Sequence, residues 1–195
     1  TNPIRVVEVP PQDAGKAIVE SFRLLLEGGA EKIGHNLKFD IGVLQWQGIA
    51  VSTPIFDTML AHTLIEPDQR HKMDYLAESM LGYTPISYDS IFGNDEGKSG
   101  QMNLFDEAEM VGEDAGGPAF EDIAQYACED ADVTWQLAGI LKDKVEELEQ
   151  HRVLYEIENP LVPVLVAMEA EGIRVDPDTL SDIGTTLGEK IDEFQ

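Results

Sequence analysis

The chain has 195 residues and a formal net charge of −25, with 38 acidic and 13 basic residues. It contains no run of about 18 apolar residues, which excludes a membrane-spanning helix, and its single cysteine, Cys128, excludes an internal disulfide or a cysteine-rich zinc site. The charge disfavours extensive phosphate contacts, which need Lys and Arg, although much of the acid is confined to runs at 94–122 and 143–149 that are typical of solvated faces or loops.

The first half of the chain predicts short strands that alternate with amphipathic helices. Hydrophobic periodicity places strands at 5–9, 31–34 and 49–56, and helices at 13–27, 35–47, 57–64 and 74–81. The stripe of the first helix includes Ile18, Phe22 and Leu25, and Gly28 follows it as a stop signal. Asp74 is in position to cap the helix at 74–81.

The second half predicts a loop followed by long helices. Residues 93–118 lose all periodicity and are rich in Gly, Asp and Glu, which predicts a surface loop. A long helix follows, with apolar or small residues at Ile123, Ala127, Val133, Leu137, Ile140, Leu141, Val145 and Leu148. A further apolar segment covers 161–170, and Asp176-Pro177 is typical of a helix start. Few short strands among many helices indicate an α/β domain that is unusually rich in helix.

Two acidic residues fall on apolar helix faces. Asp130 lies on the stripe that continues to Leu137, with Tyr126 one turn before it, and Asp40 lies beside Ile41 in the earlier helix. A carboxylate that faces a core is costly unless a cation or several hydrogen-bond donors receive it. A divalent metal between the two acids would remove this cost, and so would separate hydrogen-bonded struts. Periodicity alone leaves both interpretations open.

The sequence around these acids resembles a known family of nucleases. Residues 34–40, GHNLKFD, resemble the Asn-x-x-x-[Phe/Tyr]-Asp motif of the DEDD exonuclease superfamily, and residues 126–130, YACED, resemble its Tyr-x-x-x-Asp motif. Residues 129–134, EDADVT, and the tail from Pro160 to Asp176 are similar to the 3′→5′ proofreading exonuclease region of bacterial family A DNA polymerases. The resemblance implies an RNase H-like exonuclease fold over residues 1–150 and the start of a polymerase domain over 151–195.

The resemblance also implies a mechanism and its residues. Such enzymes hydrolyse the phosphodiester bond with two Mg²⁺ or Mn²⁺ ions, and Asp130 and Asp40 would help to hold them. Tyr126 would orient the attacking water through its hydroxyl, unless it is only a core aromatic. Asp57, Asp74, Asp132 and Glu129 are interpreted as caps or struts rather than ligands.

The implied substrate is the single-stranded 3′ end of a DNA primer, gripped by stacking and backbone contacts. His35 and Asn36 would contact the terminal nucleotide, and the family often has Gln where His35 stands. Arg70 and Tyr88 align with family residues that touch the strand and stack on a base. Ordinary surface and core-edge packing is the alternative for Arg70 and Tyr88.

One family motif does not occur in this chain. The Asp-x-Glu pair that bridges both metals should precede Asp40, yet no acid there has a partner two residues away. The expectation is an N-terminally truncated, helix-rich fragment that is inactive alone, from a cytoplasmic protein. The alternative is a catalytically silent scaffold for the polymerase. Gln101–Phe105 also resembles a sliding-clamp docking peptide, although the same residues suit a turn that is common in this family.

Overall fold

The sheet in the computed structural model, which describes residues 14–92 and 118–193, consists of two short parallel strands. They are β1 (Lys32–Gly34) and β2 (Ile55–Asp57), and Ile33 lies opposite Phe56. The strand predicted at 31–34 is confirmed, but only the end of the one predicted at 49–56 pairs. Because β1 is three residues long, it can pair with only a short stretch of its neighbour. The strand predicted at 5–9 lies outside the described residues.

Helices cover both faces of this sheet. Side chains alternate between the faces of a strand, so consecutive residues of β2 enter different cores. Phe56 packs in a core with Leu137 and Leu141 of α7, whereas Ile55 packs in a second core with Ile41 of α3 and Val166 of α9. The longer helices that supply these two cores are α3 (Leu37–Trp46), α4 (Thr58–Ile65), α7 (Phe120–Glu147) and α9 (Asn159–Glu171).

Shorter helices complete the chain. They are α1 (Ala14–Ser21), α2 (Arg23–Leu26), α5 (Met73–Leu76), the π-helix η1 (Ala77–Leu81), α6 (Tyr88–Phe92), α8 (His151–Val153), the π-helix η2 (Leu154–Glu158) and α10 (Pro177–Glu193). The helix-rich α/β class predicted from the sequence is confirmed. The helix predicted at 13–27 is divided near Phe22, and its stripe is not a core face, because Ile18 and Leu25 are 49% and 63% exposed.

Two further predictions from periodicity were wrong. Asp74 does not cap a helix, since α5 begins after Lys72 and Asp74 lies in its first turn. The apolar stripe of α7 is buried at Val133, Leu137, Leu141 and Val145, but its two ends are exposed, at Ile123, Ala127 and Leu148. The first turns of α7 therefore extend past the core, and Asp130 lies where the buried part of the helix begins.

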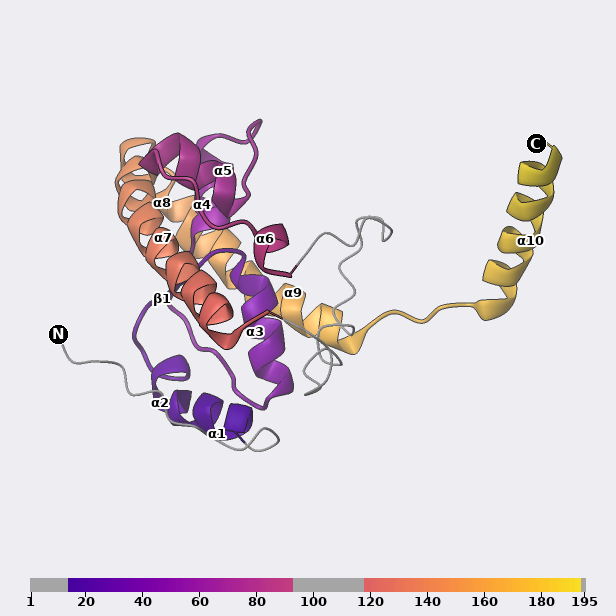
Figure 1. Cartoon of the computed structure of the whole chain (residues 1–195), viewed down its shortest axis with the longest axis horizontal. Helices are drawn as coiled ribbons and strands as arrows, with labels where there is room; N and C mark the ends of the chain where they lie inside the picture. Colours follow the sequence, from indigo (N-terminus) through magenta and orange to yellow (C-terminus); the bar gives the residue numbers. More distant parts are fainter. Residues whose placement is uncertain (1–13, 93–117, 194–195) are drawn as a thin grey trace.

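The C-terminal helices differ in how they pack. Leu154 of η2 and Val162 of α9 are buried in the two cores that β2 also enters. By contrast, α10 stands apart from the other helices at the end of an extended segment (Figure 1). Asp176 caps α10 as predicted, because its Oδ1 accepts the backbone N–H groups of Asp178 and Thr179. In the described part of the chain, no helix has both the length and the apolar character to cross a bilayer.

Candidate active site

Asp57 holds the start of α3, the helix that carries Asp40. It ends β2, is 1% exposed, and caps α4 by accepting the N–H groups of Met59 and Leu60 at 2.9 and 3.3 Å. The same carboxylate accepts the N–H groups of Asn36 and Leu37 at 3.1 and 2.8 Å. One buried carboxylate thus serves two helix starts, whose first N–H groups have no partner within the helix. The interpretation of Asp57 as a cap and strut is confirmed.

A pocket of about 380 Å³ brings both predicted catalytic carboxylates to one place. Asp40 enters it from α3 and Asp130 from α7, beside the end of β1. Its lining residues are Ile33, Gly34, His35, Leu37, Asp40, Met73, Asp130, Ala131, Thr134 and Trp135. A side chain at Gly34 would overlap that of Leu37, so the close approach of α3 to β1 requires glycine there.

Both carboxylates lie where ionisation is disfavoured. Loss of hydration inside the pocket raises the pKa of Asp40, although its side chain still reaches solvent, and the charge of Asp57 adds to the rise. The pKa of Asp130 is also raised, chiefly by burial and further by the charges of Asp74 and Glu129, while a hydrogen bond from Tyr126 opposes the rise. A cation in this pocket would stabilise both charged forms.

Tyr126 lies beside Asp130 but is not among the residues that line the pocket. It is half-buried on α7, and burial together with the charge of Asp130 raises its pKa to about 12. Its hydroxyl is therefore protonated at neutral pH and donates a hydrogen bond to Asp130. Their spacing of one helical turn made this contact predictable from the sequence.

His35 and Asn36 occupy the turn between β1 and α3. His35 lines the pocket, its Nδ1 lies 2.9 Å from the Thr58 hydroxyl, and burial lowers its pKa. Asn36 adopts the left-handed conformation, with φ of 60°, at the N-cap of α3. Asn is one of the few residues that tolerate this conformation, so the backbone gives a structural reason for Asn36 besides DNA contact.

Arg70 and Tyr88, the other predicted DNA contacts, lie outside the pocket lining. Arg70 is exposed in the turn between α4 and α5. The Tyr88 ring stacks on Phe92 at 4.4 Å, and both rings meet Tyr126 edge-on at 6.4 Å. Tyr88 therefore lies next to Tyr126, and Arg70 shows no comparable link to the site.

The described acids that precede Asp40, which are Glu20, Glu27 and Glu31, do not substitute for the Asp-x-Glu motif. Glu20 and Glu27 both pair with Arg23, at 2.7 and 2.6 Å. Glu31 pairs with Lys142 and accepts a 3.0 Å hydrogen bond from Tyr155. The remaining two, Glu8 and Asp13, lie outside the described residues. Across 14–92 and 118–193, no group of three or more His, Cys, Asp or Glu side chains is arranged to hold a metal ion.

Several residues near the site were not predicted from the sequence. Trp135 is 67% exposed at the pocket, and Thr134 donates a hydrogen bond to the sulfur of Met73 across it. The Nδ1 atoms of His62 in α4 and His71, which follows Arg70, lie 2.8 Å apart. An aromatic residue on the polar side of a predicted helix, as at Trp135, is the one clue that the sequence offered.

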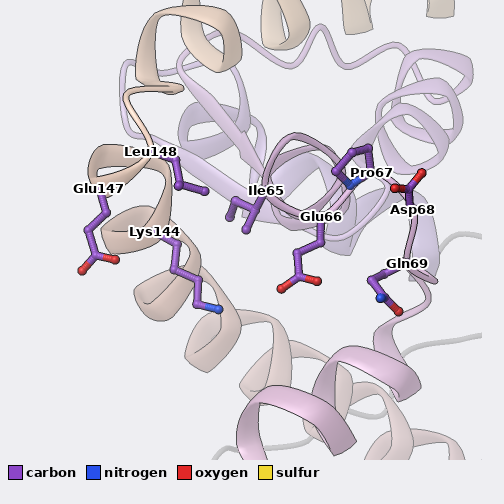
Figure 2. A pocket seen from close by; sticks show the side chains of 8 residues that line it. All are labelled: Ile65, Glu66, Pro67, Asp68, Gln69, Lys144, Glu147 and Leu148. Carbon is purple, nitrogen blue, oxygen red and sulfur yellow. The ribbon is translucent and has the colours of Figure 1, made fainter.

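A second depression, of about 430 Å³, contains none of the predicted site residues (Figure 2). It lies between the turn after α4 and the end of α7, and its charged lining residues are Glu66, Asp68, Glu147 and Lys144. Three carboxylates against one ammonium group make this surface unfavourable for a phosphate backbone. The pocket of Asp40 and Asp130 remains the candidate site.

Comparison with known proteins agrees with this assignment. The family model described as 3′–5′ exonuclease matches residues 4–146. The DNA polymerase I of Pseudomonas aeruginosa is 37% identical over 192 residues, which cover 94% of this chain and 19% of that protein. The DNA polymerases I of Rhizobium leguminosarum and Borreliella burgdorferi are 34% and 31% identical, over 93% and 84% of this chain and 16% of each relative.

The chain therefore spans about a fifth or less of the length of these relatives. The pocket that unites Asp40 with Asp130 and the parallel strands between helices suit an RNase H-like exonuclease fold, which was expected from the resemblance. With the family match over most of the sequence, they lead to one conclusion: this chain belongs to the 3′–5′ exonuclease family of the DNA polymerase A type.

Proposed function

We propose that the chain is part of a proofreading exonuclease that removes mismatched nucleotides from the 3′ end of DNA by phosphodiester hydrolysis. The main support is the shared pocket of Asp40 and Asp130, in which burial raises the pKa of both carboxyl groups. Perturbed carboxylates that converge in a cleft are typical of catalytic sites. The substrate and the polymerase domain of the longer protein are inferred from its relatives.

Asp40 and Asp130 would hold Mg²⁺ or Mn²⁺. Their hard oxygen donors suit either ion, and a cation would offset the unfavourable ionisation of both groups. When bound, two such ions would activate the attacking water and stabilise the leaving 3′ oxygen. The two carboxylates supply only part of the ligand set that this chemistry requires.

Tyr126 would orient the attacking water. Its pKa of about 12 keeps the phenol protonated at neutral pH, so it serves as a hydrogen-bond donor rather than a base. Removing the hydroxyl should therefore disturb the position of the water without removing a proton acceptor. His35 and Asn36 would contact the terminal nucleotide, and Arg70 and Tyr88 would contact the strand and a base.

We further propose that this 195-residue polypeptide alone hydrolyses DNA very slowly or not at all. The described acids before Asp40 already pair with cations, and the described residues provide no three-ligand cluster. Incubation of a labelled single strand with Mg²⁺ or Mn²⁺ should leave the DNA intact. Efficient 3′→5′ degradation that Asp130→Ala abolishes would overturn this proposal.

Metal binding gives an independent test of the same proposal. Isothermal titration with Mg²⁺ should show weak binding that Asp130→Asn reduces further, because two carboxylates leave most of the coordination shell to water. Submicromolar affinity would mean that further ligands contribute. Asp132→Asn, on the same helix but outside the pocket lining, is the matched control and should not change the affinity.

A scaffold that supports the polymerase is the second candidate function. Leu154 and Val162 belong to the segment proposed to open the polymerase domain, with a boundary near 150, yet they are buried in the same cores as β2. This continuity suits a rigid connection between two domains. If the longer protein carries an Asp-x-Glu strand and degrades DNA, the scaffold proposal fails.

The clamp-docking prediction concerns Gln101–Phe105, which lies outside the described residues. Its test is a peptide-binding assay against a bacterial sliding clamp, with Leu104 and Phe105 changed to Ala. An unchanged affinity would remove the prediction. A cytoplasmic location also stays a proposal, supported by the single free cysteine, Cys128.

A further inference from the structure

The segment that leads into α6 is attached to α7 through one side chain, Glu129. One Glu129 carboxylate oxygen accepts a hydrogen bond from the hydroxyl of Tyr83, and the other accepts the backbone N–H of Ile86 at 2.7 Å. Tyr83 follows Gly82, whose φ of 65° ends η1 in the left-handed conformation. Glu129 thus fixes the chain at two points just after it leaves η1.

This attachment determines where α6 lies. Residues 88–92 begin two positions after Ile86, and no residue of α6 is buried. Its aromatic rings make a stack of Tyr88 on Phe92 and edge contacts of both rings with Tyr126 on α7. Edge-to-face contacts of this kind contribute only about 0.5–1.5 kcal/mol each beyond burial. The attachment at Glu129 just before α6 adds to these contacts and helps to offset the cost of ordering each backbone residue, about 1–2 kcal/mol.

We propose that Glu129 is a positioning residue of the candidate site: by holding residues 83–86 against α7, it sets the Tyr88–Phe92 pair against Tyr126, beside Asp130. The inference rests on the proposed function only because Tyr126 and Tyr88 are assigned to the site there. Both oxygens of Glu129 receive donors from the 83–86 segment, and Glu129 is not among the residues that line the pocket.

The hydrogen bonds to Glu129 are charge-assisted and therefore about twice as strong as neutral ones. Replacing the carboxylate with a methyl group leaves the Ile86 N–H and the Tyr83 hydroxyl without this acceptor. Residues 83–92 should then separate from α7 more often, while the buried half of that helix, which contains Leu137 and Leu141, stays intact. The rings of Tyr88 and Phe92 would no longer shield Tyr126.

The test uses NMR of the free full-length chain with labelled aromatic residues, so it needs neither metal nor DNA. Tyr126→Phe assigns the Tyr126 signals among the five tyrosines. In the wild type, nuclear Overhauser contacts should link the rings of Tyr126 and Phe92. Glu129→Ala should remove these contacts and speed amide exchange of Ile86 at least about tenfold, as expected when a charge-assisted bond is lost.

Two variants separate positioning from a general loss of acid on α7. Glu129→Gln keeps one acceptor oxygen and should restore part of the ring contacts. Asp132→Ala removes an acid three residues later that accepts a hydrogen bond from Gln136 at 2.6 Å, and it should leave the ring contacts unchanged. Ring contacts that persist in Glu129→Ala, with unchanged exchange at Ile86, would overturn the proposal.

A fluorescence binding assay provides the second readout. A single strand ending in 3′ 2-aminopurine then tests the link to function. Quenching in the wild type that is lost in both Glu129→Ala and Tyr88→Ala supports a role in substrate positioning. Absence of quenching in the wild type would count against the proposed DNA contact of Tyr88, while the ring contacts would still decide the role of Glu129.

Discussion

Replacing Asp57 with Ala should destabilise the fold by about 2–5 kcal/mol. The variant loses the side-chain cap of α4, which costs about 0.5–2 kcal/mol. It also leaves the buried N–H of Leu37 without its acceptor, which costs a further 1–3 kcal/mol or so. Both hydrogen bonds are present in the wild type, at 2.9 Å from Met59 and 2.8 Å from Leu37.

Urea unfolding followed by circular dichroism at 222 nm measures this loss. Asp57→Asn should show roughly half of it, because the amide keeps one acceptor oxygen but presents a donor where the other stood. Asp176→Ala is the matched control: Asp176 accepts equivalent hydrogen bonds, at 3.1 and 3.2 Å, at the start of the exposed helix α10. Loss of these hydrogen bonds should change the free energy of unfolding by well under about 1 kcal/mol, since α10 lies outside the cores.

The reasoning fails if Asp57→Ala unfolds within about 1 kcal/mol of the wild type at an unchanged dependence on urea. Such a result would mean that water or another group satisfies the same N–H groups. Amide exchange distinguishes local from global effects: the amides of Asn36 and Leu37 should lose protection in Asp57→Asn even at urea concentrations where the cores remain folded.

Three further variants test the site. Asp130→Asn should raise the free energy of unfolding at pH 7, by less than about 1 kcal/mol because the group is half-exposed. Burial raises the pKa of Asp130 in the folded state, so the wild type loses stability as the pH rises through this value. Calorimetry should therefore show a higher thermal midpoint for the variant at pH 7 and no difference below about pH 4. Burial lowers the pKa values of His35 and His62, so their contribution to stability is present above about pH 6.5 and is lost as the pH falls through the folded-state values. In the variant with both residues changed to Gln, the urea midpoint should differ less between pH 7 and pH 5 than in the wild type. Asn36→Gly keeps the left-handed turn, so stability should stay within about 0.5 kcal/mol, and single-strand affinity measured by fluorescence anisotropy should fall if the Asn36 side chain contacts DNA.

Elements with strong periodicity were predictable from the sequence, and elements made by tertiary contacts were not. The periodicity of α3, α4 and α7 identified these helices nearly to their ends. The length of β2 depends on its partner, because a segment counts as a strand only where a neighbour offers hydrogen bonds. In the same way, the exposed stripe of α1 shows that an apolar face becomes core only if another element covers it.

The candidate site was predictable in its parts and not in its supports. The contact of Tyr126 with Asp130 follows from helical spacing within one element. The approach of α3 to α7 joins residues far apart in sequence, and only the resemblance indicated it. The attachment at Glu129 and the double cap at Asp57 were not predictable. Each joins a side chain to backbone N–H groups, and the fold determines where those groups lie.

The two predicted catalytic carboxylates have different surroundings, so they can be perturbed separately. Asp40 lies in the first turn of α3, and Asp57 at the end of β2 binds the N–H groups at the start of that helix. Tyr126 and Asp130 lie on α7, and Glu129 of the same helix binds the segment that leads to α6. Asp57→Asn should therefore disturb Asp40 and leave the ring contacts of Tyr126 intact, and Glu129→Ala should do the reverse. Titration of both carboxyl groups by ¹³C NMR in the two variants measures this independence. If either substitution shifts both groups alike, the pocket responds as one cooperative unit, and the separate anchoring inferred from these hydrogen bonds is wrong.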